Sequence, residues 1–362
     1  MDPLLHQDEV GRIIARESGH TRQEGGVRLD FKDLMRVRVN NILLVSSLYD
    51  YYTVVEDGQL TEALFNEYSE LNLHYAPHIT RVSSGEEALR LMESRDFDLV
   101  LSMLRLGDMD LASFCATMKH AHPDIPLFLL SFQSAEFDLF LKSADTARFD
   151  NVFIWAGDRT LFLAIIKLYE DVRNAPVDCL EFGVRSIMLV EDSPWFYSSY
   201  LPLIYAELIT QVQALIEEGR NFADKLLRQR ARPKILLARN YEEASQLLRR
   251  YGETMLGVIS DLSFERGGAT DPRAGLLLAR EARGMNPELP ILIQSSSIDL
   301  RQEIEHEGLA FVDKGSRVLL QELSDFMTRN FGFGDFVFRL PDGTEVSRAR
   351  SIREMRERLR YV

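Results

Sequence analysis

The sequence predicts an α/β protein with two doubly wound domains, each with five parallel strands in a (βα)5 arrangement, followed by a small C-terminal β-hairpin and helix. Two observations lead to this prediction. Short apolar runs alternate with helical patterns in two successive sets, one from residue 41 and one from residue 186. The runs are also apolar along their whole length, which is typical of parallel strands that are covered on both faces of a sheet.

In the first set, the helical patterns follow strands in regular alternation. The expected strands are 42–45, 78–82, 99–103, 127–130 and 152–155, and the expected helices lie near 60–72, 84–94, 110–121, 134–143 and 158–173. We assign residues 1–38 to an N-terminal arm and residues 39–175 to the first domain. The short stretch 174–178, Asn-Ala-Pro-Val-Asp, is expected to be a linker that holds the two domains close together.

The second set ends in polar residues that could form one site. We assign residues 183–330 to this domain, with strands at 186–190, 234–237, 257–260, 291–294 and 310–312. Because parallel strands of an open sheet end on one edge, the residues that follow four of them should converge, namely Glu191, Asp192, Asp261, Ser295 and Lys314. Carboxylates this close repel one another unless a cation lies between them, and hard divalent ions bind such oxygens.

The order and type of these residues resemble the receiver domain of two-component response regulators. The resemblance implies that Asp261 is the phosphoacceptor, that Lys314 pairs with the phosphate, and that Ser295 and Phe311 are the switch residues. It also implies Mg²⁺ as cofactor, bound by Glu191, Asp192, Asp261 and the backbone carbonyl of Ser263. The expected partner is a histidine kinase or a phosphotransfer protein. Such a module is no enzyme beyond phosphorylating itself from small donors and slowly dephosphorylating itself.

The first domain resembles the same fold with its site removed. Serines 46 and 47 stand where the acid pair is expected, and Met103 stands at the phosphoacceptor position. Trp155 replaces the lysine, and only Ser131 keeps its residue type. Because a thioether cannot accept a phosphoryl group as a carboxylate does, this domain resembles a pseudo-receiver. The nearby acids Asp108 and Asp110 are read as a loop acid and a helix N-cap.

Two segments of the second domain are longer than the family pattern. Apolar residues in residues 195–231 repeat at spacings of four and three, which fits either burial within the chain or a homodimer. Ser193 and Pro194 are expected to start this helix, and a break is expected near Gly219. After Asp261, residues 263–270 form either a flexible flap or a tolerated insertion, and Asp271 is expected to cap the next helix.

The tail, residues 331–362, is expected to form a hairpin from 336–340 and 345–348 and a last helix that starts with a Ser351/Glu354 capping box. With the domains before it, this layout resembles the N-terminal regulatory region of bacterial proteins with a PEP-synthase-like, PEP/pyruvate-binding catalytic part. The resemblance implies such a catalytic region, or a partner of that kind, as the target of regulation.

The composition limits the function classes. A net charge of −14 argues against a nucleic-acid binder, and no apolar run reaches the ~20 residues of a membrane span. With two cysteines in no spaced motif, we expect a cytoplasmic protein. The leading hypothesis is a phosphorylatable module, and the alternative is a receiver-like scaffold that acts by contact alone. An aspartate-nucleophile phosphatase is least favoured, because Ser263 stands where its second acid would be.

Overall fold

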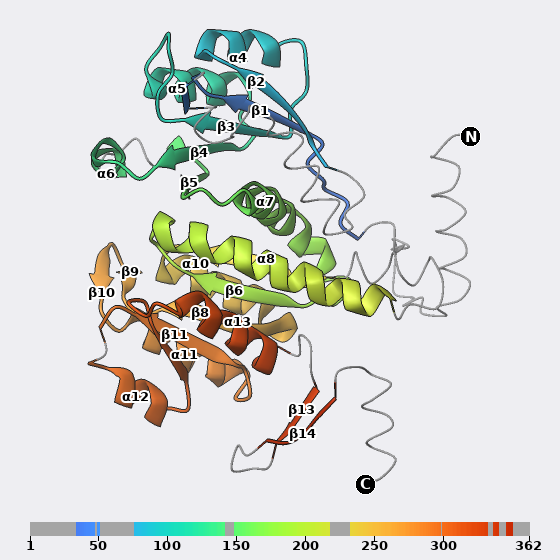
Figure 1. Cartoon of the computed structure of the whole chain (residues 1–362), viewed down its shortest axis with the longest axis vertical. Coiled ribbons are helices and arrows are strands. Elements are labelled where there is room, and N and C mark those ends of the chain that lie inside the picture. Colours follow the sequence, from blue (N-terminus) through green and yellow to red (C-terminus); the bar gives the residue numbers. More distant parts are fainter. Residues whose placement is uncertain are drawn as a thin grey trace. The chain divides into compact units, whose positions relative to one another are not determined.

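The computed structural model describes residues 34–47, 49–50, 76–141, 148–217, 232–297, 299–331, 336–339 and 345–349. These residues fall into two compact units, whose elements are labelled in Figure 1. The first unit takes Val37–Glu170 and Ser193–Pro202. The second unit takes Asp171–Asp192 and the described residues of Met1–Arg36 and Leu203–Val362. Helices α7 and α8 are each divided between the units, so neither unit is a single uninterrupted stretch of chain.

The first unit contains a five-stranded parallel sheet, as predicted. Its strands are β1 (Asn41–Val45), β2 (His78–Val82), β3 (Leu99–Met103), β4 (Leu127–Phe132) and β5 (Asn151–Trp155), in the order β2-β1-β3-β4-β5. The helices are α4 (Gly85–Met92), α5 (Leu111–Ala121), α6 (Ala135–Leu141) and the first part of α7 (Thr160–Asp178). The helix expected near residues 60–72 lies outside the described residues. This strand order places ligand sites at the carboxyl ends of the strands.

The two acids Asp108 and Asp110 have the structural roles that the sequence indicates. Asp108 accepts hydrogen bonds from the backbone N–H groups of Gly85 and Glu86, both at 2.9 Å, at the N-terminus of α4. Asp110 is the N-cap of α5 and accepts from the backbone N–H of Ser113 at 2.9 Å. These carboxylates therefore satisfy free N–H groups of helix ends.

The second unit repeats the same topology. Its strands are β6 (Ser186–Val190), β7 (Lys234–Ala238), β8 (Met255–Asp261), β11 (Ile291–Ser295) and β12 (Ala310–Asp313), in the parallel order β12-β11-β8-β6-β7. Its helices are α8 (Pro194–Glu217), whose first turns belong to the first unit, α10 (Tyr241–Tyr251), α11 (Ala274–Met285), α12 (Arg301–His306) and α13 (Leu319–Asn330). Two five-stranded parallel sheets, each flanked by helices, confirm the predicted doubly wound α/β fold class.

Helices cover both faces of the second sheet. On one face, Val190 and Val258 share an apolar cluster with Leu248 of α10 and Leu278 of α11. On α8, four of the apolar residues that repeat at spacings of four and three are fully or almost fully buried, namely Leu201, Tyr205, Leu208 and Val212. This part of the repeat is therefore buried within the chain, while the side chains beyond Val212 and the break expected near Gly219 lie outside the described part of the structure.

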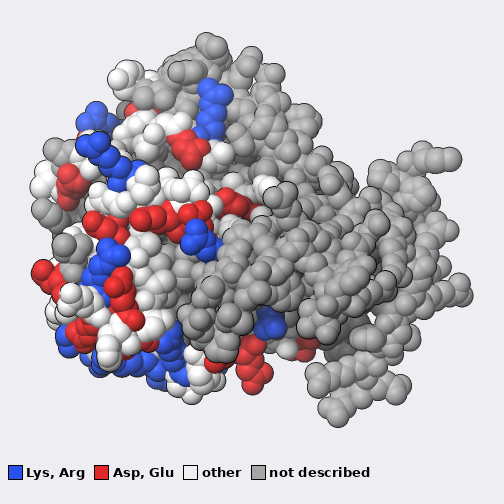
Figure 2. All heavy atoms as spheres, turned by 60° about the horizontal axis from the view of Figure 1, so that its bottom comes forward, with Lys and Arg blue, Asp and Glu red and all other residues white. Residues whose placement is uncertain are grey.

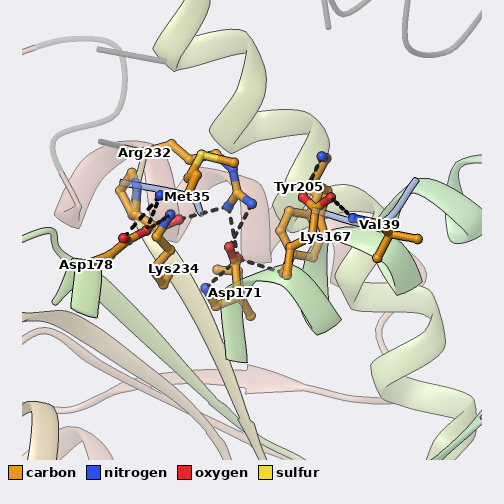
Figure 3. A network of polar contacts seen from close by, with 11 residues as sticks. Met35, Val39, Lys167, Asp171, Asp178, Tyr205, Arg232 and Lys234 are labelled. Atoms are coloured by element: carbon orange, nitrogen blue, oxygen red, sulfur yellow. Dashed lines mark hydrogen bonds and ion pairs between the residues drawn. The ribbon is translucent and has the colours of Figure 1, made fainter. Parts of the chain in front are cut away.

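A buried polar network ties three segments of the second unit together (Figure 3). Both oxygens of Asp171, near the end of α7, accept hydrogen bonds from the Arg232 guanidinium, at 2.7 and 2.9 Å. The Tyr205 hydroxyl of α8 donates to Asp171 at 2.9 Å, and the backbone N–H of Ile235 donates at 3.0 Å. Buried charges are stable only when they are paired and hydrogen-bonded in this way.

A second ion pair lies beside it. Lys234, at the start of β7, is fully buried, and its Nζ lies 2.7 Å from Asp178 Oδ2. Asp178 also accepts the backbone N–H of Met35, whose φ of 50° is unusual for a residue with a side chain. The segment before β1 is thus held at the end of α7.

Two local predictions are wrong. Residues 174–178 are not a linker, because α7 continues to Asp178 despite Pro176. Asp271 is not the N-cap of α11, since that position is Arg273 and Asp271 pairs with Arg266 at 3.0 Å. The segment after Asp261 forms a two-stranded hairpin, β9 (Phe264–Arg266) and β10 (Ala269–Asp271).

The C-terminal hairpin is present as β13 (Phe336–Arg339) and β14 (Glu345–Ala349), which pair antiparallel. The last helix, with Ser351 and Glu354, lies outside the described residues, as does most of the N-terminal arm. No helix among those described is both long and apolar enough to span a bilayer.

Candidate functional site

The predicted acids come together at the carboxyl edge of the second sheet. Glu191 and Asp192 follow β6, and Asp261 is the last residue of β8, the strand beside it. One oxygen of each carboxylate lies within 4.8 Å of one oxygen of the other two. Three carboxylates at this spacing, contributed by adjacent strands, match the oxygen donors that Mg²⁺ prefers. The donor set therefore fits the expected cofactor.

Lys314 places a positive charge between two of these acids. Its Nζ lies 2.7 Å from Glu191 Oε2 and 2.8 Å from Asp261 Oδ2. Glu191 has no exposed surface and Asp261 is 8% exposed, so solvent screens these ion pairs little. The backbone N–H of Lys314 donates to the carbonyl of Ser295 at 2.9 Å, which fixes the start of the turn that carries the ammonium.

Asp192 differs from its neighbours in keeping part of its surface open to solvent. Partial burial of its carboxylate raises the pKa of Asp192, the negative charge of Asp261 raises it further, and the charge of Lys314 opposes both. The site therefore holds more negative charge than Lys314 alone compensates. A bound divalent cation would relieve this repulsion.

The backbone around Asp261 is tightly fixed. The N–H of Leu262 donates both to Asp261 Oδ1, at 2.7 Å, and to the carbonyl of Gln294, at 2.8 Å. A Cβ atom on Gly275, in the first turn of α11, would lie 2.3 Å from the carbonyl oxygen of Asp261. Only glycine permits this approach of helix and strand. Neither Leu262 nor Gly275 was predicted from the sequence, although a glycine close to the expected start of a helix could have drawn attention to Gly275.

The two expected switch residues lie on neighbouring strands. Ser295 ends β11, is 6% exposed, and its Oγ accepts the N–H of Ser297 at 3.0 Å. Phe311 lies on β12 and is partly buried, with the guanidinium carbon of Arg301 5.4 Å from its ring centroid. Arg301 also bonds Glu305 at 2.8 Å. This cation above the aromatic ring was not predicted, because the contact depends on where α12 packs.

The β9-β10 hairpin follows the site directly. Its residue Phe264 is fully buried, and Arg266 places its guanidinium carbon 5.0 Å from the Tyr241 ring centroid. The N–H of Gly267 donates to Glu242 at 3.0 Å. These contacts favour the insertion over the freely flexible flap. Ser263 lies in the bend between β8 and β9.

The corresponding edge of the first sheet is apolar. Met103 and Trp155 are 2% and 8% exposed, respectively. The hydroxyl of Ser131 donates to the carbonyl of Phe132 at 3.1 Å, and that of Ser47 donates to Asp50 at 2.9 Å. The hydroxyl of Ser46 is buried without a hydrogen-bond partner among the described residues. Within that part of the chain, this edge brings no group of three metal-binding side chains together.

The charged surface around the second unit is mixed. Figure 2 shows basic and acidic side chains interspersed over the described residues of one face. Two ion pairs join α11 and its N-cap to α12 and its C-cap: Arg273 pairs with Glu303 and Arg280 with Glu307, both at 2.5 Å. Such exposed pairs add little to stability.

No family model and no curated protein matches the chain. The signal receiver domain of an HD domain-containing protein from Pseudomonas fluorescens Pf-5 matches 44% of this chain and 100% of its own, at 18% identity and a TM-score of 0.28. The receiver domain of a sensor histidine kinase from Pseudomonas aeruginosa PAO1, solved with a magnesium ion in its active-site cleft, matches 36% of this chain and 98% of its own, at 18% identity and a TM-score of 0.28. A structure described as a two-component response regulator/GGDEF domain protein matches 80% of this chain and 98% of its own, at 14% identity and a TM-score of 0.32. Likeness at these identities concerns the fold alone.

Proposed function

We propose that the chain is a two-component signalling module that accepts a phosphoryl group on Asp261 in a Mg²⁺-dependent reaction. The observation that supports this most is the position of Lys314, whose ammonium lies between Glu191 and Asp261. The Asp261 carboxylate can attack a phosphorus atom if its own negative charge and that of the phosphoryl group are partly neutralised. Lys314 would supply one positive charge, and a metal ion held by the acids would supply the other.

The reaction transfers a phosphoryl group from a nitrogen or oxygen atom of the donor to a carboxylate oxygen of Asp261. An Asp261 oxygen forms a bond to phosphorus, and the bond from phosphorus to the donor breaks. The donor leaves as histidine, which takes up a proton, or as acetate if acetyl phosphate is used. Mg²⁺, held by Glu191, Asp192 and Asp261 together with the carbonyl of Ser263, would neutralise phosphoryl oxygens. Lys314 would exchange part of its pairing with Asp261 for pairing with the phosphate.

Phosphorylation is then expected to change the surface near β11 and β12. The hydroxyl of Ser295, whose oxygen accepts the N–H of Ser297, would donate a hydrogen bond to the phosphoryl group. Phe311 would turn inward and leave its contact with Arg301. A change in this surface is how the module would act on a protein partner.

The experiment is the intact mass of the full chain after incubation with acetyl phosphate and Mg²⁺. One phosphoryl group per chain is expected, and none with Asp261→Asn or with excess EDTA. The matched control is Asp325→Asn on α13, an exposed acid paired with Gln321 and Arg329, which should still be phosphorylated. An unmodified mass for the unaltered chain would contradict the proposal.

The same experiment separates this function from its alternative. A scaffold that acts by contact alone would stay unmodified, although its acids and lysine could still bind Mg²⁺. A histidine kinase or phosphotransfer protein as donor belongs to the proposal. A PEP-synthase-like catalytic region as the target, and a homodimer through residues 195–231, stay predictions.

A further inference from the structure

One edge of the first sheet is closed by side chains. β5 is an edge strand that pairs only with β4, so the polar groups on its other side need partners. The backbone N–H of Ile154 donates to Ser198 Oγ at 3.0 Å, and the hydroxyl of Tyr197 donates to the carbonyl of Val152. Both partners lie on α8, so two hydroxyl groups replace a sixth strand.

These contacts are buried and involve the ring of Tyr197 as well. Ser198 is 6% exposed and Tyr197 is 1% exposed. The Tyr197 ring lies edge-on to Phe153, the residue between the two bonded positions, at a centroid distance of 5.8 Å. Three successive residues of β5 are therefore held by two successive residues of α8. Hydrogen bonds shielded from water in this way are costly to break.

The same helix starts at the candidate metal site. α8 begins at Pro194, only two residues after Asp192, and Tyr197 lies in its first turn. At 1.5 Å per residue, the five residues from Asp192 to Tyr197 extend over less than ~10 Å when helical. The sequence between them, Ser-Pro-Trp-Phe, contains no glycine. The clamped turn is therefore the first regular structure that follows Asp192 along the chain.

We propose that the pseudo-receiver unit is an anchor for α8, and that the hydroxyl clamp formed by Tyr197 and Ser198 on β5 couples this unit to metal and phosphoryl binding at Glu191, Asp192 and Asp261. The proposal rests on the function proposed above. It gives the emptied domain a role that needs only the backbone of its edge strand. Coupling is reciprocal, so the clamp sets metal affinity and metal binding changes the clamp.

The first test uses the unaltered full chain. Hydrogen exchange of residues 152–155 is measured with and without Mg²⁺ and beryllofluoride, and β2, the other edge of the same sheet, is the internal control. We expect exchange in β5 to change at least ~3-fold and exchange in β2 to stay constant. An equal response in both strands, or in neither, would overturn the coupling.

The second test removes the two hydroxyl groups with Tyr197→Phe/Ser198→Ala. Exchange at Ile154 should become roughly tenfold faster, because one buried bond is lost. Mg²⁺ affinity, measured by calorimetry, should fall roughly three- to tenfold. Ser199→Ala is the matched control, since this neighbouring hydroxyl donates to the carbonyl of Trp195 within α8. It should leave both quantities unchanged.

The outcomes separate the two proposals. If the unaltered chain takes up neither Mg²⁺ nor a phosphoryl group, the proposed function fails. If it binds both and the double variant binds Mg²⁺ with unaltered affinity, only the clamp proposal fails. A double variant that unfolds leaves the first test decisive, because that test needs no substitution.

Discussion

The two units have the same strand order but opposite chemistry at the carboxyl edge of the sheet. In the first unit, Met103 and Trp155 are buried at this edge and need no counter-charge. In the second unit, Asp261 and Lys314 occupy the same two positions of the topology and pair at 2.8 Å. The difference shows that the backbone alone does not require the charged site. Because replacing buried ion pairs by apolar side chains can even stabilise a protein, the stability of the fold does not by itself account for these charges.

The largest expected effect comes from removing the cation of the charged edge. Lys314→Met leaves the fully buried Glu191 without its 2.7 Å ammonium partner and should lower the free energy of unfolding by about 3–5 kcal/mol. Urea unfolding measures this. Arg301→Met, which removes the exposed pair with Glu305, is the control and should cost less than ~1 kcal/mol. Similar values for the two variants would contradict the assigned role of Lys314.

A smaller loss is expected when a charge is added to the apolar edge. Met103→Asp buries a carboxylate at a position that is 2% exposed and should lower the free energy of unfolding by about 2–4 kcal/mol. It should not add a second phosphoryl group, because Ser46, Ser47 and Trp155 offer neither metal ligands nor an ammonium. Peptide mapping after acetyl phosphate treatment checks this. A label within residues 39–175 would show that the first unit is no pseudo-receiver.

A third comparison concerns the helix after the third strand of each sheet. Gly275 is the second residue of α11, and Ala112 is the second residue of α5. Gly275→Ala should cost about 1–3 kcal/mol and slow phosphorylation, because its Cβ would press on the carbonyl of Asp261. The reverse change, Ala112→Gly, should cost no more than ~1 kcal/mol. Thermal unfolding and the phosphorylation rate distinguish them, and equal costs would argue against a tight approach at Gly275.

The smallest effect is expected when the folded chain, which has one thiol in each unit, is treated with an alkylating reagent. Cys115 and Cys179 are both buried, and burial raises the pKa of Cys179 to about 12. Since the thiolate is the reactive form, Cys179 should stay protonated and unmodified by iodoacetamide at about pH 8. In urea, both thiols should react. Rapid alkylation of Cys179 in the folded chain would show that the structure opens at the end of α7.

The sequence was a good guide where short-range pattern decides the structure. Apolar runs predicted the ten strands of the two sheets. The polar residues that follow these strands were predicted to come together, and the acids among them do lie close together near Lys314. The order in which the strands pair could not be predicted from the sequence. The prediction of the site did not need this order, because parallel strands of a sheet all end on the same edge.

The errors have a common physical cause. Pro176 and the polar residues around it suggested a linker, yet α7 continues through them because Asp178 is held by Lys234. Asp271 is a residue type that often caps a helix, but here its carboxylate pairs with Arg266 across the hairpin instead. In both places a long-range partner overrides the local preference. The clamp of β5 by Tyr197 and Ser198 is likewise invisible without the tertiary fold.

The end of α7 has a consequence for modularity. A protein cut at residue 183 would keep every residue of the candidate metal site but lose Asp171 and Asp178. Arg232 and Lys234 would then lose the carboxylates that hold them at 2.7 Å. An exchange of domains at this position would meet the same penalty. The second unit therefore includes the end of α7, well before its first strand, because Asp171 and Asp178 belong to it and supply the charges that pair with Arg232 and Lys234.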